Sequence, residues 1–217
     1  MDLIPNVNLP EGQSGNWKVE KFTISKREAT LYNVNAHGRP VREGTYTRLV
    51  RNGKVVMSDT PAEKRDHFEP VYRAYGRCLV NGLGLGMIVS AMLEKKKHRY
   101  LPGDHVPPGK FDDKALIPTV EHVTVIEKDA DVIALVGLPL KERYGDRLTI
   151  IHADAFEYTP SKGERYDFVW HDIWDNICSD NLSEMHKLHR KYGRYCKWQG
   201  SWGRDTCEYY RRSNSGY

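Results

Sequence analysis

Three glycines at alternate positions, set between two apolar segments, constrain the fold of this chain more than any other feature. Residues 77–81 have the character of a short buried strand, Gly82, Gly84 and Gly86 follow, and residues 87–93 continue as an apolar helix. A strand, a tight glycine turn and a helix in this order are typical of nucleotide-binding units. Because glycine has no Cβ, its backbone can pass close to a ligand. Tight packing of the helix on the strand is the alternative explanation.

Strand and helix patterns alternate over the rest of the chain. We expect strands at residues 123–126, 148–152, 166–170 and about 194–198, and helices at about 61–74, 129–138 and 181–192. This alternation predicts a parallel sheet with helices on both faces. The expected fold class is therefore α/β, with a Rossmann-like, doubly wound and mostly parallel sheet. The residues after 192 leave no clear room for a sixth and a seventh strand.

The sequence before residue 61 has a different character. Proline and glycine are frequent in residues 1–17, which we expect to form an irregular arm. Short alternating stretches at about 19–24, 29–33, 46–50 and 55–57, with Asn52-Gly53 as a hairpin signal, predict a small antiparallel β region at 18–60. The Rossmann-like domain then covers 61–217, with a polar insertion at 95–119 and a short C-terminal tail. The insertion suits a lid over the pocket and a plain surface loop equally well.

The composition is that of an ordinary soluble globular protein. Of the 217 residues, 39% are hydrophobic and 29% are charged. No apolar run approaches the roughly 20 residues that a membrane helix needs, and the N-terminus lacks the plan of a secretory signal. We therefore expect a cytoplasmic location and no membrane association. The four cysteines, Cys78, Cys178, Cys196 and Cys207, form no Cys-x-x-Cys pair, so we expect reduced thiols.

Basic residues are concentrated at 95–99, 187–194 and 211–212, within a net charge of +4. Such clusters can follow phosphates, but they are more often solvated surfaces, and no recognition motif accompanies them. Nucleic-acid binding is therefore an alternative that we do not favour. His186 and His189 have a spacing that suits a metal on a helix face, but their basic neighbours favour a solvated face. We predict no metal site.

Carboxylates follow the second and third predicted strands of the main sheet. Glu127 ends the strand at 123–126, where a carboxylate can accept both hydroxyls of a ribose. Its distance from Gly86 exceeds the usual spacing of about 20 residues, but removing the insertion restores that spacing. Asp154 follows the next strand, where it can meet an adenine amino group. A surface or capping role is the alternative for both residues.

In this order the segments resemble the motifs of class I S-adenosylmethionine-dependent methyltransferases. Residues 80–86 are similar to their first motif, 125–129 to their second, 152–155 to the segment that contacts adenine, and 166–172 to their fourth strand. The likeness covers about residues 76–192. It implies that S-adenosylmethionine contacts residues of these motifs, namely Asn81, Gly82, Leu83, Gly84, Gly86, Glu127, Lys128, Asp154, Ala155 and Asp172.

A narrower likeness is to the spermidine synthase branch of that superfamily. Those enzymes place a small β domain before the nucleotide-binding fold and end the fourth strand with Asp-x-x-Asp, as Asp172-Ile173-Trp174-Asp175 does here. Asp66-His67 also resembles their layout. The likeness implies that a carboxylate at this place takes a proton from an amine nucleophile or holds it electrostatically.

These observations predict an S-adenosylmethionine-dependent transferase, most simply a methyltransferase, with Asp172 and Asp175 orienting or deprotonating the acceptor and His171 as a helper. Capping of the following turn is the alternative for these side chains. The acceptor would be a small molecule or an amine, and a homodimer is left open. Three other functions stay open: aminopropyl transfer from decarboxylated S-adenosylmethionine, a binding module without catalysis, and a nicotinamide-dependent dehydrogenase.

Overall fold

The parallel sheet at the centre of the molecule has five strands in the described part of the chain. The computed structural model describes residues 4–34, 39–96, 98–99, 116–117 and 119–214. The sheet has the order β11-β10-β5-β8-β9, and every neighbouring pair is parallel. Its strands are β5 (Gly76–Asn81), β8 (Val120–Glu127), β9 (Leu148–His152), β10 (Tyr166–His171) and β11 (Cys196–Ser201). The chain therefore builds outward from β5 first on one side and then on the other, which confirms the Rossmann-like fold.

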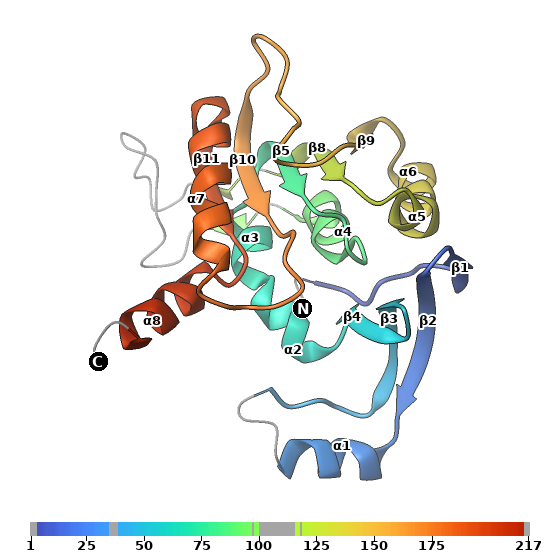
Figure 1. Cartoon of the computed structure of the whole chain (residues 1–217). Helices are drawn as coiled ribbons and strands as arrows, with labels where there is room; N and C mark the ends of the chain where they lie inside the picture. Colours follow the sequence, from blue (N-terminus) through green and yellow to red (C-terminus); the bar gives the residue numbers. More distant parts are fainter. Residues whose placement is uncertain (1–3, 35–38, 97, 100–115, 118, 215–217) are drawn as a thin grey trace.

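Helices cover both faces of this sheet (Figure 1). Even-numbered residues of β5 face the core shared with α4 (Met87–Glu94) and α6 (Leu138–Tyr144), whereas Leu79 faces the core shared with α7 (Asn181–Tyr192). The alternation of side chains along a strand produces these two cores from one apolar run. The predicted bounds of α7 are confirmed.

A four-stranded antiparallel sheet lies beside the carboxyl ends of the parallel strands (Figure 1). It consists of β1 (Gly12–Ser14), β2 (Trp17–Ile24), β3 (Gly44–Arg51) and β4 (Lys54–Ser58). Asn52 and Gly53, both with positive φ, turn β3 into β4, as their sequence predicts. The small antiparallel β region is confirmed, whereas the domain boundaries at residues 17 and 60 stay predictions.

The strand predicted at residues 29–33 is wrong, because this segment belongs to helix α1 (Lys26–Val34). Ser25 and Glu28 form a capping box: the hydroxyl of Ser25 accepts the N–H of Glu28, and the carboxylate of Glu28 accepts the N–H of Ser25. These bonds satisfy donors at the start of a helix. The alternation of three residues was a weaker signal than this cap.

Two prolines change the helices that the sequence predicts. The helix expected at 61–74 is divided at His67 into α2 (Pro61–Asp66) and α3 (Phe68–Arg73). Pro70 cannot donate to the carbonyl of Asp66, and its ring would clash with that carbonyl in a continuous helix. The helix expected at 129–138 begins as α5 (Ala130–Val132), widens into a π-helical turn at Ile133–Gly137 and continues as α6, with Pro139 at the junction.

The N-terminal segment packs on the rest of the fold although residues 5–11 have no regular structure. Ile4, Val7 and Leu9 are buried in the main core. The fully buried carboxylate of Asp59 accepts the N–H groups of Val7 and Thr47, at 2.8 and 2.7 Å. The expected irregular arm is therefore held beside β3 through Asp59, and it is not irregular throughout, because residues 12–14 form β1 and Trp17 begins β2.

The expected basic surface at residues 95–99 is partly wrong. Lys95 is buried, and its ammonium group donates to the carbonyls of Tyr72 and Ala74 at the end of α3, while burial lowers its pKa to about 8. The remainder of the predicted insertion lies largely outside the described residues; within it, β6 (His98–Arg99) pairs with β7 (Leu116–Ile117). The predicted C-terminal tail contains α8 (Arg204–Asn214), which packs on α7.

Two further findings concern thiols and membranes. All four cysteines are free thiols, as expected. In the described part of the chain, no helix has both the length and the apolar character needed to cross a membrane.

Candidate functional site

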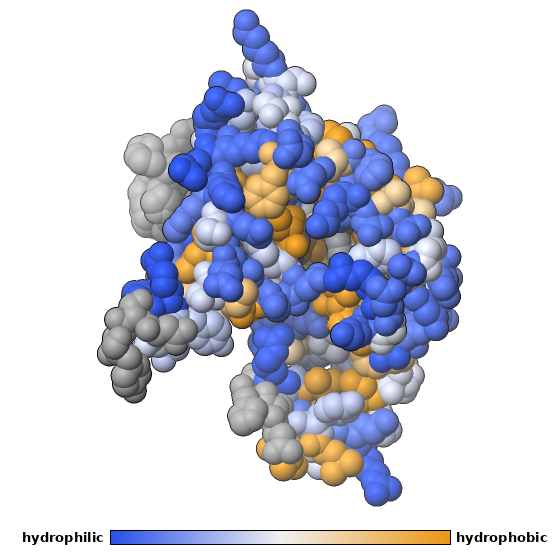
Figure 2. Space-filling view, in the orientation of Figure 1, coloured by the Kyte–Doolittle hydropathy of each residue, from blue (hydrophilic) through white to orange (hydrophobic). Residues whose placement is uncertain are grey.

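A cavity of about 580 Å³ opens at the carboxyl ends of the parallel strands, where the order of strands reverses between β5 and β10. This reversal is the place where ligands of open α/β sheets bind. Figure 2 shows a hollow near the middle of this face, with apolar surface around it. The small antiparallel sheet closes the other side through Trp17, Leu49 and Met57, so two parts of the sequence build one cavity.

The glycine loop, residues 82–86, divides this cavity. Close contacts with neighbouring protein atoms require glycine at all three of its glycine positions. All three have positive φ. A Cβ on Gly82 would overlap the carbonyl oxygen of Asp172, one on Gly84 would lie 2.5 Å from Sδ of Met57, and one on Gly86 would overlap Leu140. Gly82 and Gly84 also line the cavity, with Leu83 between them, whereas Gly86 packs on α6. Tight packing therefore accounts for Gly86.

Glu127 fixes the glycine loop to the end of β8. One carboxylate oxygen accepts the N–H of Leu83 and the other accepts the N–H of Asp129, both at 2.8 Å. Glu127 is buried yet lines the cavity, and Lys128 and Asp129 line it beside Glu127. The last residues of the predicted second motif therefore lie together at the end of β8 on the cavity wall, and their contact with a cofactor stays a prediction.

The end of β9 lines the same side of the cavity as Glu127. Asp154 lines the cavity and is exposed, with one oxygen accepting the N–H of Phe156 at 2.7 Å. Ala155 and Phe156 follow it in the sequence and also line the cavity, as does Val132 of α5. A polar carboxylate next to apolar walls is the composition typical of small-molecule sites.

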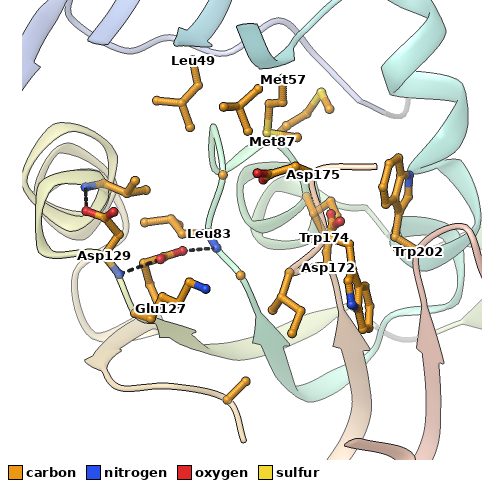
Figure 3. A pocket seen from close by; sticks show the side chains of 18 of the residues that line it. Leu49, Met57, Leu83, Met87, Glu127, Asp129, Asp172, Trp174, Asp175 and Trp202 are labelled. Carbon is orange, nitrogen blue, oxygen red and sulfur yellow. Dashed lines mark hydrogen bonds between the residues drawn. The ribbon is translucent and has the colours of Figure 1, made fainter. Parts of the chain in front are cut away.

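The other half of the cavity is acidic and aromatic. In Figure 3, Asp172, Trp174, Asp175 and Trp202 lie on one side of the glycine loop, and Glu127 and Asp129 lie on the other. The side chain of Asp172 is 15% exposed. Burial and the nearby carboxylates of Glu63 and Asp66 raise the pKa of Asp172 to about 7.

His67 faces Asp172 from the break between α2 and α3. Its Nδ1 lies 3.8 Å from Oδ2 of Asp172, which is too long for a hydrogen bond. No described residue supplies a hydrogen-bond partner to this buried nitrogen. Burial lowers the pKa of His67 to about 4, so its ring is neutral at pH 7.

Asp175 is engaged in a different way from Asp172. It is about half exposed and forms a close ion pair with Arg51 of β3, whose guanidinium group lies 5.1 Å from the centroid of the Trp17 ring. This ion pair links the loop after β10 to the small sheet across the cavity. The two aspartates of the Asp-x-x-Asp motif therefore have different surroundings: Asp172 lies near carboxylates, and Asp175 is neutralised.

His171 and Asn81 do not line the cavity. Asn81 Nδ2 lies 2.7 Å from Nδ1 of His171, and the other ring nitrogen lies 3.2 Å from Oε1 of Gln199. His171 is fully buried, and burial lowers its pKa to about 3. With both nitrogens in contact with protein groups, His171 holds β5, β10 and β11 together. Its predicted role as a catalytic helper does not fit this position, and neither does cofactor contact by the Asn81 side chain.

The acidic wall of the cavity consists of Glu63, Asp66 and Asp172, and only Asp172 was among the predicted site residues. Arg39, Glu63, Asp66, His67 and Trp202 all line the cavity. The Asp66-His67 pair resembles the layout of the spermidine synthase branch, but the position of α2 over the end of β10 depends on contacts between distant segments. Arg39 forms two hydrogen bonds with Asp66, at 3.1 and 2.8 Å, in a loop that carries no recognisable motif.

Metal binding finds no support among the described residues. No group of three or more His, Cys, Asp or Glu side chains there could hold an ion. His189 instead contacts Ser201 and Arg204 through its two ring nitrogens, at 2.8 and 3.0 Å.

No protein-family model matches the chain, and neither does any curated protein. Among solved structures, the N-methyltransferase NodS from Bradyrhizobium japonicum WM9 matches with 13% identity and a TM-score of 0.42 over 64% of each chain. The 23S rRNA methyltransferase ErmE matches with 12% identity and a TM-score of 0.41, over 63% of this chain and 43% of its own. The DhpI-SAM-HEP complex matches with 14% identity and a TM-score of 0.38, over 63% and 48%.

The solved structures that this chain resembles include methyltransferases. In each of these three matches, the aligned part spans less than two thirds of the length of the solved chain. At these TM-scores and identities the likeness assigns no activity or substrate to this chain.

Proposed function

We propose that this protein is an S-adenosylmethionine-dependent transferase, most simply a methyltransferase. The observation that carries the proposal is the place of Glu127, at the end of β8 on the wall of the switch-point cavity. Each of its carboxylate oxygens accepts one backbone N–H and keeps a second lone-pair site. Two such sites match the two hydroxyls of a ribose.

The other residues of this half of the cavity fit the remainder of an adenosyl ligand. Asp154 has acceptor capacity for an exocyclic amine, and Ala155, Phe156 and Val132 offer apolar surface to a purine ring. The first turn of α4 also lines the cavity, and the N–H groups of a first helical turn have no partner within the helix. Such a turn favours a carboxylate, as in the amino-acid part of the ligand.

When bound, S-adenosylmethionine supplies a methyl group on a positively charged sulfur, and this sulfur keeps the bonding electron pair after the transfer. The protein has to hold the acceptor in line with that methyl group. Asp172 is the candidate to take a proton from the acceptor, because a pKa of about 7 leaves the group divided between both forms at neutral pH. Asp175 would act by holding the loop through Arg51.

Aminopropyl transfer is the second candidate, favoured by the Asp172-x-x-Asp175 spacing and the acidic wall. Calorimetry with S-adenosylmethionine, its decarboxylated form and NAD⁺ separates the candidates. We expect S-adenosylmethionine to bind and Glu127→Ala to weaken it by at least about tenfold. Glu142→Gln, on the exposed surface of α6, is the matched control. Preferential binding of NAD⁺ or of the decarboxylated form would overturn the methyltransferase proposal.

A binding module without catalysis is tested by a separate measurement. The full chain is incubated with S-adenosylmethionine and a panel of amines and phenols, and S-adenosylhomocysteine is quantified by mass spectrometry. We expect product with the unchanged protein and a large loss with Asp172→Asn, measured at a concentration of S-adenosylmethionine that saturates each protein. Binding without product for any acceptor class would favour the module.

A further inference from the structure

Three of the four described carboxylates in the half of the cavity opposite Glu127 are bound by protein donors. One oxygen of Glu63 accepts the N–H of Ser58 and the other accepts its hydroxyl group, at 2.8 and 2.7 Å. Asp66 and Asp175 each form an ion pair with an arginine that also lines the cavity. These three groups therefore have little charge left to offer a ligand.

Asp172 is the fourth carboxylate, and no described residue donates a hydrogen bond to its side chain. The side chain lines the cavity and is 15% exposed. A mostly buried acceptor without a donor is costly, so a ligand that supplies one O–H or N–H group gains from this contact. Asp172 is therefore the polar group of this half that is open to a ligand.

The surroundings of Asp172 disfavour charge of either sign. Burial is the main cause that raises the pKa of Asp172 to about 7, so the anion is disfavoured there. His67 faces Asp172, yet burial lowers the pKa of His67 to about 4, so a cation is disfavoured at the same place. Burial shifts an acid and a base in opposite directions, and both shifts favour the neutral form. An uncharged ligand therefore fits this place better than an ammonium group or a carboxylate.

Two tryptophans give this half of the cavity its apolar surface. Trp174 and Trp202 both line the cavity and are partly exposed, and no described aromatic ring stacks on either. The indole N–H of Trp174 donates to Glu184 of α7 at 2.7 Å, which fixes the orientation of the ring. In Figure 3 both tryptophans lie on the same side of the glycine loop as Asp172. Indole rings without an aromatic partner favour a ligand that is itself an aromatic ring.

The volume of the cavity limits the size of this ligand. A single cavity of about 580 Å³ has to hold both the proposed adenosyl ligand and the acceptor. Sites of about 300–1,000 Å³ are typical of small molecules. The ion pair between Arg51 and Asp175 also joins the small sheet to the loop after β10 across the cavity. A single ring therefore fits better than a segment of a polymer.

The basicity of Asp172 suits the hydroxyl group of a phenol. A phenolic O–H has a pKa of about 10, whereas water has a pKa of about 15.7 and alcohols resemble water. The pKa of Asp172, about 7, lies much closer to the phenolic value. Proton transfer to a side chain is most effective when its pKa is near the operating pH and the difference in acidity is small.

We propose that the acceptor of this transferase is a small phenol with a single ring. The ring lies against Trp174 and Trp202, and the hydroxyl group donates to the carboxylate of Asp172. This inference rests on the proposed transferase function and names the substrate class of that site. The phenolic oxygen forms a bond to the methyl carbon while the carbon–sulfur bond breaks and its electron pair stays on sulfur. The phenolic proton passes to Asp172 and then to water, and the products are an aryl methyl ether and S-adenosylhomocysteine.

The first test measures binding without S-adenosylmethionine, so it does not depend on catalysis. The full chain is titrated at pH 8 with phenol, anisole, cyclohexanol and benzylammonium chloride by saturation-transfer NMR. We expect phenol to bind at least about fivefold more tightly than anisole, which lacks the donor, and cyclohexanol, which lacks the aromatic ring. Benzylammonium should also bind more weakly than phenol. If any of these three probes binds as tightly as phenol, the proposal is overturned.

Variants then place the phenol in the cavity. Asp172→Ala removes the acceptor and should abolish the preference for phenol over anisole. Trp174→Leu should weaken phenol by at least about fivefold, and Trp174→Phe, which keeps an aromatic ring, should restore most of the affinity. Asp146→Ala and Tyr210→Leu change exposed residues outside the cavity and should bind phenol like the unchanged protein. Circular dichroism verifies that each variant is folded. Unchanged phenol binding in both Asp172→Ala and Trp174→Leu would overturn the assignment.

The two proposals fail separately in a final measurement with S-adenosylmethionine present, in which mass spectrometry quantifies anisole formed from phenol. We expect anisole from the unchanged protein. Selective phenol binding without binding of S-adenosylmethionine would overturn the transferase function and leave the phenol site. Binding of S-adenosylmethionine with product formed only from amines would overturn only the assignment of the acceptor.

Discussion

The indole N–H of Trp17 donates to the carboxylate of Asp129 across 2.6 Å, and the other oxygen of that carboxylate accepts the N–H groups of Asp131 and Val132. Asp129 therefore caps α5 and fastens β2 to the end of β8 at the same time. Asp129 thus joins the Arg51–Asp175 ion pair in holding the small sheet at the rim of the cavity.

Trp17→Phe should weaken this junction. The change keeps the ring but leaves one oxygen of a partly buried carboxylate without its donor, and a lost hydrogen bond to a charged group destabilises by about 1.5–3 kcal/mol. Urea unfolding followed by circular dichroism measures the difference. Tyr46→Phe, which removes a neutral hydrogen bond to Arg42 far from the junction, should lower the free energy of unfolding by less. Equal effects would contradict the special role of Asp129.

Gly84→Ala should destabilise the protein through contact with Met57. Gly84 has a φ of +51°, and its added Cβ would lie 2.5 Å from Sδ of Met57. Gly163 also has a positive φ, +88°, but a Cβ there has no atom within 4 Å. Gly163→Ala therefore measures the backbone strain alone. We expect Gly84→Ala to be the less stable variant by about 1–3 kcal/mol, because overpacking adds to strain.

Asp172→Asn should stabilise the fold at alkaline pH. The pKa of Asp172 is raised from 3.8 to about 7, so the folded state binds more protons than the unfolded state between these values. Stability from this group therefore falls as pH rises from about 4 to 7 and stays low above that. The substitution should raise the melting temperature at pH 8 but not at pH 4. At pH 8 the free energy of unfolding should rise by at most roughly 4 kcal/mol. A gain independent of pH would contradict the assignment.

Two buried histidines, His67 and His171, and the partly buried His189 should make the protein sensitive to acid. Burial lowers the pKa values of His67 and His189 to about 4 and that of His171 to about 3. Unfolded histidines bind protons below about pH 6.5, so the unfolded state gains protons there. Stability should therefore fall as pH decreases from 6.5 to 4. Asp172 opposes this fall, because in this range its carboxyl group holds up to about one more proton in the folded state than in the unfolded state. Melting curves between pH 4 and 8 measure this slope; no net proton uptake on unfolding at pH 5 would contradict it.

The parallel sheet was predictable because each strand is marked locally. The apolar runs at 123–126, 148–152 and 166–170 each end in polar residues, and periodicity alone finds them. The same local reasoning failed at residues 26–34, where a capping box outweighed alternation, and at Pro70 and Pro139, where one ring changed a helix.

The acidic half of the site was less predictable because distant segments build it. Nothing near Asp172 in the sequence announces Glu63 or His67, more than a hundred positions earlier. His171 was misread for the same reason: its neighbours Asn81 and Gln199 become visible only when β5, β10 and β11 are in register. Met57 is a further case, since its contact with Gly84 depends on how the small sheet docks.

The division of the cavity by the glycine loop also matters for engineering. The side of the cavity proposed to hold the adenosyl group is built by residues 82–89 and 126–156, whereas much of the opposite wall comes from residues 39–67. If that proposal holds, a mutational library confined to the N-terminal stretch, with Trp17 and Met57 kept, would vary the recognition of a second substrate while leaving the proposed adenosyl half intact. Binding on the two sides of the cavity can therefore be changed separately, by mutations in different parts of the sequence.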